Sequence, residues 1–182
     1  MDHINNKKDF FEGGTIFSDS AEKNHMARNE KVTEVLNDLI RINNDRIEGY
    51  ERAVKDTKDK DADLQAMFHR MADESKQYAS ELESEVKESG GDAASDATVS
   101  GKIYRVWMDF KSAISGKARK SILASCEYGE DAAQKAYEEA LKADTGLPSD
   151  VRQLIVNQKA ALKNSHDAIK RYRDMHEARQ AD

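Results

Sequence analysis

Apolar side chains recur every three or four residues along several stretches of this 182-residue chain, which is the spacing of one face of an α-helix. The spacing predicts four long helices and one short helix, over residues 30–57, 63–88, 101–115, 117–143 and 149–178. Gly90 ends the second long helix, and Gly146 with Pro148 separates the last two. Ala, Glu, Lys and Leu dominate the composition, a bias that favours long helices. The fold class is therefore all-α.

The four long helices form two hairpins with short turns, joined by a long crossover that carries the short helix. The two halves also resemble each other, because EGYERAVKD at 48–56 aligns with KAYEEALKAD at 135–144, tyrosine on tyrosine. Two hairpins joined by a long crossover have the connectivity of a ferritin-like four-helix bundle rather than of a simple up-and-down bundle. With 38% apolar residues the chain can build one continuous core, so we expect a single domain.

Residues 1–28 differ in character from the rest of the chain. They are mostly polar, contain Gly13 and Gly14, and show no helical period, whereas Asn29 is a suitable N-cap for the first helix. We therefore expect a flexible N-terminal arm over 1–28 and a bundle domain over 29–182. Docking onto a partner protein is the alternative role for this arm.

Each helical stripe contains one polar residue at a position where the period requires an apolar one. These residues are Asn43, Glu74, Glu130 and His166. Counted from the hairpin turns, they share one level of the bundle to within about one helical turn. We therefore expect all four side chains to point inward and form a polar layer. Tyr50 and Tyr137 each follow a polar position by seven residues and are placed to donate hydrogen bonds to that layer.

A polar layer inside a four-helix core is the usual place of a carboxylate metal site, in which two helices supply Glu and two supply Glu-x-x-His. The matching positions here read Asn43, Glu74-x-x-Gln77, Glu130 and Lys163-x-x-His166, so three of the six ligands are present. Glu74, Glu130 and His166 are the candidate metal ligands, for at most one divalent cation (iron, manganese or zinc) at partial occupancy. A diiron centre is not expected, because the Lys163 ammonium would repel a second cation.

A second interpretation has no cofactor at all. In it Lys163 pairs with Glu130 and Glu74 in place of a metal, because buried charges persist only when they are paired. Glu48 and Glu127 are the replacements if the helices are turned relative to the predicted stripes.

Charge and motifs exclude several classes of function. The net charge of −6, the pI near 5.5 and the short basic clusters argue against a nucleic-acid partner. No apolar run has the length of a membrane span, and the N-terminus lacks the apolar core of a signal peptide, so we expect a cytoplasmic protein. Cys126 is the single cysteine, which rules out an intrachain disulfide. No phosphate-binding glycine loop or nucleophile elbow supports a hydrolase or a nucleotide-binding protein.

Four stretches carry a resemblance to a known family: NDRIEGYERA, VWMDFKSAISG, SCEYGEDAAQKAYEEAL and SHDAIKRYRD. They resemble a bacterial family of ferritin-like four-helix-bundle proteins known only as a domain of unknown function. The resemblance implies the ferritin-like bundle and a bacterial, non-secreted setting, in a superfamily often linked to metal handling or oxidative stress. The chain departs from functional ferritins and rubrerythrins at Asn43, Gln77 and Lys163, which argues against redox catalysis.

The sequence thus favours a non-enzymatic or weakly metal-binding ferritin-like protein with a stress-associated accessory role. Two alternatives stay open: an iron- or manganese-dependent oxidase or peroxide scavenger, and a helical protein–protein interaction module. By analogy with other bundles of this type, we expect at least a homodimer.

Overall fold

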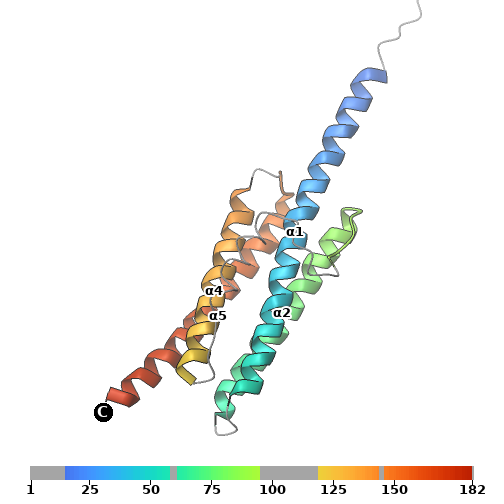
Figure 1. Ribbon diagram of the computed structural model, residues 1–182. Coiled ribbons are helices and arrows are strands. Elements are labelled where there is room, and N and C mark those ends of the chain that lie inside the picture. The colour runs from blue at the N-terminus through green and yellow to red at the C-terminus, as the bar shows by residue number, and fades with distance from the viewer. Residues whose placement is uncertain (1–14, 58–60, 95–118, 144–145, 182) are drawn as a thin grey trace, which may run out of the picture.

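A computed structural model describes residues 15–57, 61–94, 119–143 and 146–181. This part of the chain contains four helices: α1 (Thr15–Asp56), α2 (Ala62–Glu88), α4 (Arg119–Lys142) and α5 (Ser149–Ala181), with no strand among the described residues (Figure 1). The all-α prediction is confirmed, and the observed helices start and end within three residues of the predicted bounds, except at the start of α1. The short helix expected over 101–115 lies outside the described residues.

Helix α1 begins at Thr15, so the prediction that it starts near residue 30 was wrong. Its first turns extend beyond the other helices (Figure 1), and the side chains of 22–28 are exposed. Hydrophobic period detects a face that packs, and the side chains of 22–28 are exposed, so the helicity of this part leaves no such pattern. Adding residues to an existing helix costs far less than starting one, which explains how the segment continues from the packed part. The flexibility of residues 1–28 stays a prediction.

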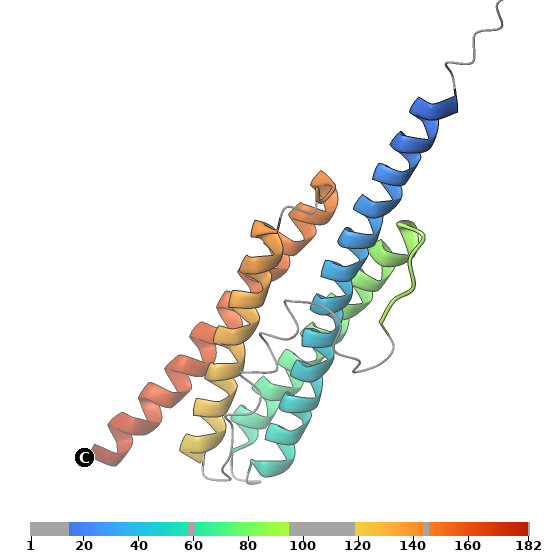
Figure 2. The ribbon, with the colours of Figure 1, turned by 45° about the horizontal axis from the view of Figure 1, so that its top comes forward.

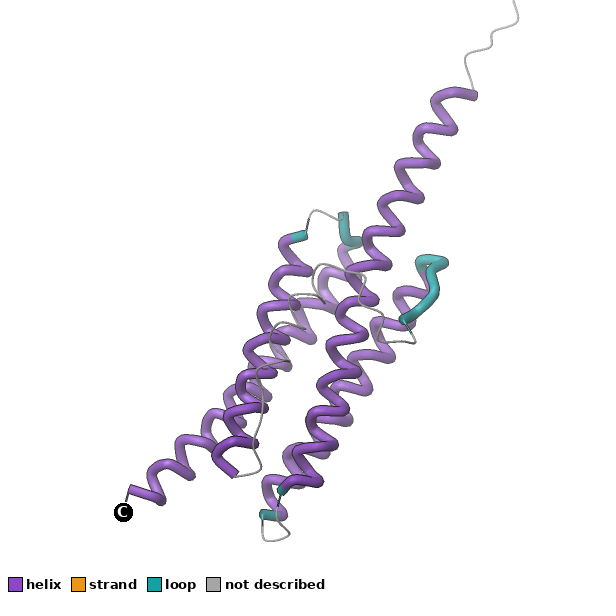
Figure 3. The backbone as a smooth tube through the Cα atoms, in the orientation of Figure 1, coloured by secondary structure: helices purple, strands orange, loops and turns teal. Residues whose placement is uncertain are grey.

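The helices form two hairpins that lie side by side. Helix α1 packs along α2, and α4 packs along α5, while α1 borders α4 and α2 borders α5. Figures 2 and 3 show the two hairpins from different sides, with loops only between the helices of the described part. Where α1 leaves the bundle it is tied to the second hairpin, because Arg28 Nε and Nη2 donate to the Gly146 carbonyl oxygen at 2.9 and 2.7 Å.

The core is divided into two apolar clusters along the bundle axis. One contains the α1 residues from Val32 to Ile42 and meets Tyr137 and Leu162. The other lies nearer the α1–α2 turn, where Tyr50 stacks on Phe68 with ring centroids 5.9 Å apart. Between the clusters lies a set of buried polar side chains, which we call the polar layer. It consists of Asn43, Arg46, Ser75 and Glu130, together with Gln158, which is bonded to Asn43 through Tyr137 and lies on α5 beside residues of the first cluster.

Candidate functional site

The polar layer is centred on an ion pair between α1 and α4. Arg46 donates to Glu130 Oε1 from Nη2 at 2.6 Å and from Nε at 3.2 Å, and the two side chains are 2% and 1% exposed. Tyr50 donates its hydroxyl proton to the same carboxylate oxygen. Arg46 Nη1 donates to Ser75 Oγ on α2 at 2.9 Å. Charge-assisted hydrogen bonds of this kind are the strong ones, and here they join three helices.

A second string of hydrogen bonds continues from this pair to α5. Asn43 Nδ2 donates to the Tyr137 hydroxyl oxygen at 2.7 Å, and that hydroxyl donates to Gln158 Oε1 at 2.8 Å. Gln158 Nε2 donates in turn to Glu81 Oε2 on α2 at 2.9 Å. Arg46 Nη1 reaches Asn43 Oδ1 at 3.4 Å, which links the two strings. All four described helices therefore contribute to one connected network.

Helical spacing explains why these side chains meet. Asn43, Arg46 and Tyr50 are separated by three and four residues, so they lie on one face of α1, in line with the apolar stripe that packs against α4. Glu130 and Tyr137 are seven residues apart and share one face of α4 in the same way. The expected hydrogen bonds from the two tyrosines to the polar layer are confirmed, because Tyr50 donates to Glu130 and Tyr137 donates to Gln158.

Burial and the ion pair shift the pKa values of several groups in and beside the layer. Burial lowers the pKa of Arg46, but the adjacent Glu130 and the Tyr50 hydroxyl outweigh burial and leave it above the ordinary value. Burial, followed by the Glu130 charge, raises the pKa of Tyr50 well above its ordinary range. Burial likewise raises the pKa of Tyr137. Cys126 precedes Glu130 by one turn, and burial together with the Glu130 charge raises the pKa of its thiol to about 12. At neutral pH Arg46 is thus a cation, and the adjacent phenols of Tyr50 and Tyr137 and the Cys126 thiol are neutral.

One atom of the layer is left over. All three donors reach Glu130 Oε1, while Glu130 Oε2 is buried with no hydrogen-bond partner among the described residues. A buried carboxylate oxygen without a donor costs free energy.

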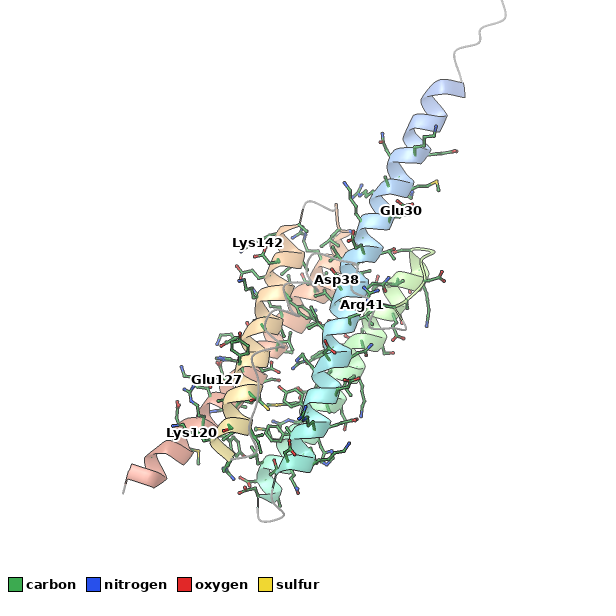
Figure 4. The ribbon with its side chains drawn as sticks, in the orientation of Figure 1. Glu30, Asp38, Arg41, Lys120, Glu127 and Lys142 are labelled. Atoms are coloured by element: carbon green, nitrogen blue, oxygen red, sulfur yellow. The ribbon has the colours of Figure 1, made fainter. Side chains whose placement is uncertain are left out.

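Another buried ion pair lies nearer the N-terminus of α1, where Arg41 Nη1 is 3.4 Å from Asp38 Oδ1 (Figure 4). Among the described carboxylates, only those of Asp38 and Glu130 belong to fully buried residues.

The predicted inward set was half right. Asn43 and Glu130 are buried in the polar layer, as expected, and no exchange of Glu130 for Glu127 is needed. Glu74 lies at the edge, where its side chain is 35% exposed and contacts Arg70 at 3.7 Å and the Ser165 hydroxyl at 3.3 Å.

His166 also lies at the edge rather than in the layer, with its side chain 20% exposed. Its Nε2 is 3.0 Å from Asp131 Oδ1, and its Nδ1 is 3.1 Å from Asp167 Oδ1. The structure therefore does not bring Glu74, Glu130 and His166 together as one ligand set.

A shift of one position on each of two helices explains this correction. The residues that face the core are Ser75 and Ser165, the direct neighbours of Glu74 and His166. One residue corresponds to about 100° around a helix, because a turn has 3.6 residues. Ser75 is satisfied inside the protein, since its hydroxyl donates to the Met71 carbonyl oxygen at 2.7 Å. Because serine is polar, hydrophobic period alone does not identify it as a core residue. The core position is then assigned to the residue next to it.

The expected pairing of Lys163 with the core carboxylates was wrong. Lys163 is exposed and pairs with Asp167 at 2.8 Å on the surface of α5. The cation of the layer is Arg46, which the sequence analysis missed. Its spacing from Asn43 and Tyr50 was the available signal, because it puts a charged side chain on the apolar face of α1.

The side chains of the layer do not fit the diiron centre that is typical of this arrangement of helices. Such a centre needs bridging carboxylates and two imidazoles, whereas this layer offers one carboxylate, already bound to a guanidinium, among amide, hydroxyl and phenol groups. Within the described residues, no group of three or more His, Cys, Asp or Glu side chains has the arrangement of a metal site.

Two hairpins packed around a central polar layer define the class: this is a ferritin-like four-helix bundle. A solved structure with the same fold is a dodecameric thioferritin, the bacterioferritin-related protein from Bacteroides fragilis, with a TM-score of 0.68 and 14% identity over 88% of this chain and 98% of that one. The chain belongs to the family described as Domain of unknown function (DUF2383), whose model matches residues 31–143. The expected resemblance is thus confirmed. No functionally curated protein matches the sequence. None of the described helices has the length and apolar character needed to span a membrane.

Proposed function

We propose that this chain is a non-enzymatic, ferritin-like accessory protein with a stress-associated role, in which the polar layer joins the helices and does not hold a stoichiometric metal. One observation carries the proposal: the Arg46 guanidinium forms a 2.6 Å ion pair with Glu130 at the centre of the bundle. The remaining polar groups are bonded to one another through all four described helices. The hydrogen bonds of this network therefore hold the helices together, which is a structural role.

Electrostatics support this role. Two unit positive charges about 4 Å apart repel by roughly 4 kcal/mol at an effective dielectric constant near 20, and the repulsion doubles for a divalent ion. A cation on Glu130 would lie close to the Arg46 guanidinium and would compete with it for the same carboxylate. An oxidase or peroxide scavenger of the two-metal type would have to bind two such cations beside Arg46.

The test is the metal content of the full chain, purified without chelator and measured by elemental analysis. We expect well under one equivalent of iron, manganese or zinc per chain. Purified protein with two iron or manganese ions per chain would contradict the proposal and support the oxidase or peroxide scavenger instead. If one equivalent is found, alanine variants of Glu74, Glu130 and His166 show whether the predicted ligand set holds it.

A second candidate function is assembly with other protein chains, and the free end of α1 favours it. This end extends beyond the bundle (Figure 1), and its Met26 side chain is 64% exposed. The related thioferritin is named as a dodecamer. We expect at least a homodimer in solution, measured by sedimentation at micromolar concentration, and a weaker assembly for Met26→Lys than for the exposed control Lys31→Met. A monomeric wild-type protein contradicts this candidate.

A further inference from the structure

The internal sequence repeat reappears in the structure as two matched contacts. The alignment of Tyr50 with Tyr137 also aligns position 43 with position 130, because both pairs are 87 residues apart. Tyr50 on α1 donates to Glu130 on α4, and Tyr137 on α4 accepts a hydrogen bond from Asn43 on α1. Each tyrosine therefore bonds the polar residue that lies seven positions before the other tyrosine.

The two matched halves differ in charge. One half has the Glu130 carboxylate, and the other has the neutral Asn43 amide. The position that the alignment pairs with Arg46 is Ala133, which is fully buried. The layer thus contains one carboxylate and one guanidinium, and its net charge is zero. Restoring the symmetry with a second carboxylate at position 43 would leave one negative charge too many for the single guanidinium.

We infer that positions 43 and 130 are the two halves of a divalent-cation site that this chain has closed, with Asn43 removing one ligand and the Arg46 guanidinium filling the place of the cation. The inference rests on the proposed structural role of the layer. It adds that the Arg46 guanidinium occupies the place of a divalent cation. A pair of buried carboxylates flanked by phenols suits a hard divalent ion such as Mn²⁺ or Fe²⁺. The buried Glu130 Oε2, which has no partner among the described residues, is a carboxylate oxygen with unused capacity to bind such an ion.

The experiment reopens the site with two substitutions in the full chain. Asn43→Glu with Arg46→Met supplies the second carboxylate and removes the guanidinium; we call it the reopened variant. The matched control is Asn43→Gln with Arg46→Met, which has the same shape but lacks the added charge; we call it the amide control. Thermal unfolding with and without MnCl₂ is the readout, and calorimetric titration gives the stoichiometry. We expect Mn²⁺ to raise the Tm of the reopened variant by roughly 5 °C at saturation, and that of the amide control and the wild type by less than about 1 °C.

Each other outcome counts against a specific statement. A folded reopened variant without a Mn²⁺-dependent rise in Tm overturns the inference, and so does an equal rise in the amide control. A reopened variant that stays unfolded both with and without Mn²⁺ also overturns it, because binding to a rebuilt site would stabilise the folded state. A wild-type protein that binds Mn²⁺ stoichiometrically contradicts the proposed function itself, whatever the variants do.

Discussion

At the scale of single residues, the polar layer shows how a buried charge is tolerated. Arg46 has three acceptors on three helices, namely Glu130, Ser75 and Asn43. Desolvation of a guanidinium is costly, and the cost is offset only while these partners stay in place. The energetic importance of the pair therefore appears when one member is removed.

Removing one partner should destabilise the protein strongly. We expect Glu130→Gln or Arg46→Met to lower the free energy of unfolding by about 3–5 kcal/mol, as for other broken buried pairs, whereas the double variant Arg46→Met, Glu130→Leu recovers most of the loss. Urea denaturation monitored by circular dichroism measures the change. The exposed pair of Lys163 with Asp167 is the control, and Lys163→Met should cost less than about 1 kcal/mol. Equal costs for Glu130→Gln and Lys163→Met would contradict the role given to Arg46.

The raised pKa values of Tyr50, Tyr137 and Cys126 predict alkaline unfolding. Each group keeps its proton in the folded state above the pH at which the unfolded chain releases it. Stability from these groups is therefore complete below about pH 8 and is lost as pH rises from there toward the folded pKa values, first from Cys126 and then from the two tyrosines. Absorbance at 295 nm should show that Tyr50 and Tyr137 ionise only as the protein unfolds, and Tyr137→Phe should remove one of these two late ionisations. Reversible ionisation of all six tyrosines in the folded protein would contradict this.

At the scale of elements, the hydrophobic stripes predicted the packed helices because each of them buries one face. The sequence could not reveal the start of α1, where the described side chains of 22–28 are exposed, nor the exact rotation of α2 and α5. In both of those helices a serine occupies the core position, and a longer charged or aromatic polar neighbour looked like the core residue. Arg46 was missed for the related reason that its partner, Glu130, lies 84 residues away on another helix.

The turn between α4 and α5 depends on a glycine. Gly146 has φ of 64°, and a Cβ atom there would lie 2.6 Å from Arg28 Nε. We expect Gly146→Ala to lower the free energy of unfolding by about 1–2 kcal/mol. The substitution strains the backbone and displaces Arg28 from its hydrogen bonds to the carbonyl oxygen of residue 146. The matched control is Gly129→Ala, in the middle of α4 with no atom near the added methyl group, which should gain about 0.5–1 kcal/mol. Thermal unfolding of both variants checks the opposite signs.

At the scale of the whole molecule, the bundle core and the free end of α1 are separable parts. The described side chains before Arg28 are exposed, and Arg28 itself ties α1 to the second hairpin at Gly146. Deletion of residues 1–23 should therefore lower the Tm of the bundle by less than about 2 °C while reducing its helical circular dichroism signal. A fall of more than about 5 °C would show that this end supports the core.

The polar layer between the two apolar clusters also fixes the register of the helices. A core made only of Leu, Ile and Ala tolerates sliding, because one apolar surface replaces another as a helix shifts along its neighbour. Here a slide of one turn, about 5.4 Å, would carry the Arg46 guanidinium away from Glu130 and into an apolar cluster. Buried polar residues specify alignment in coiled coils by the same penalty on wrong partners. The ion pair therefore selects a single alignment of α1 against α4 from the several that the apolar side chains alone would permit.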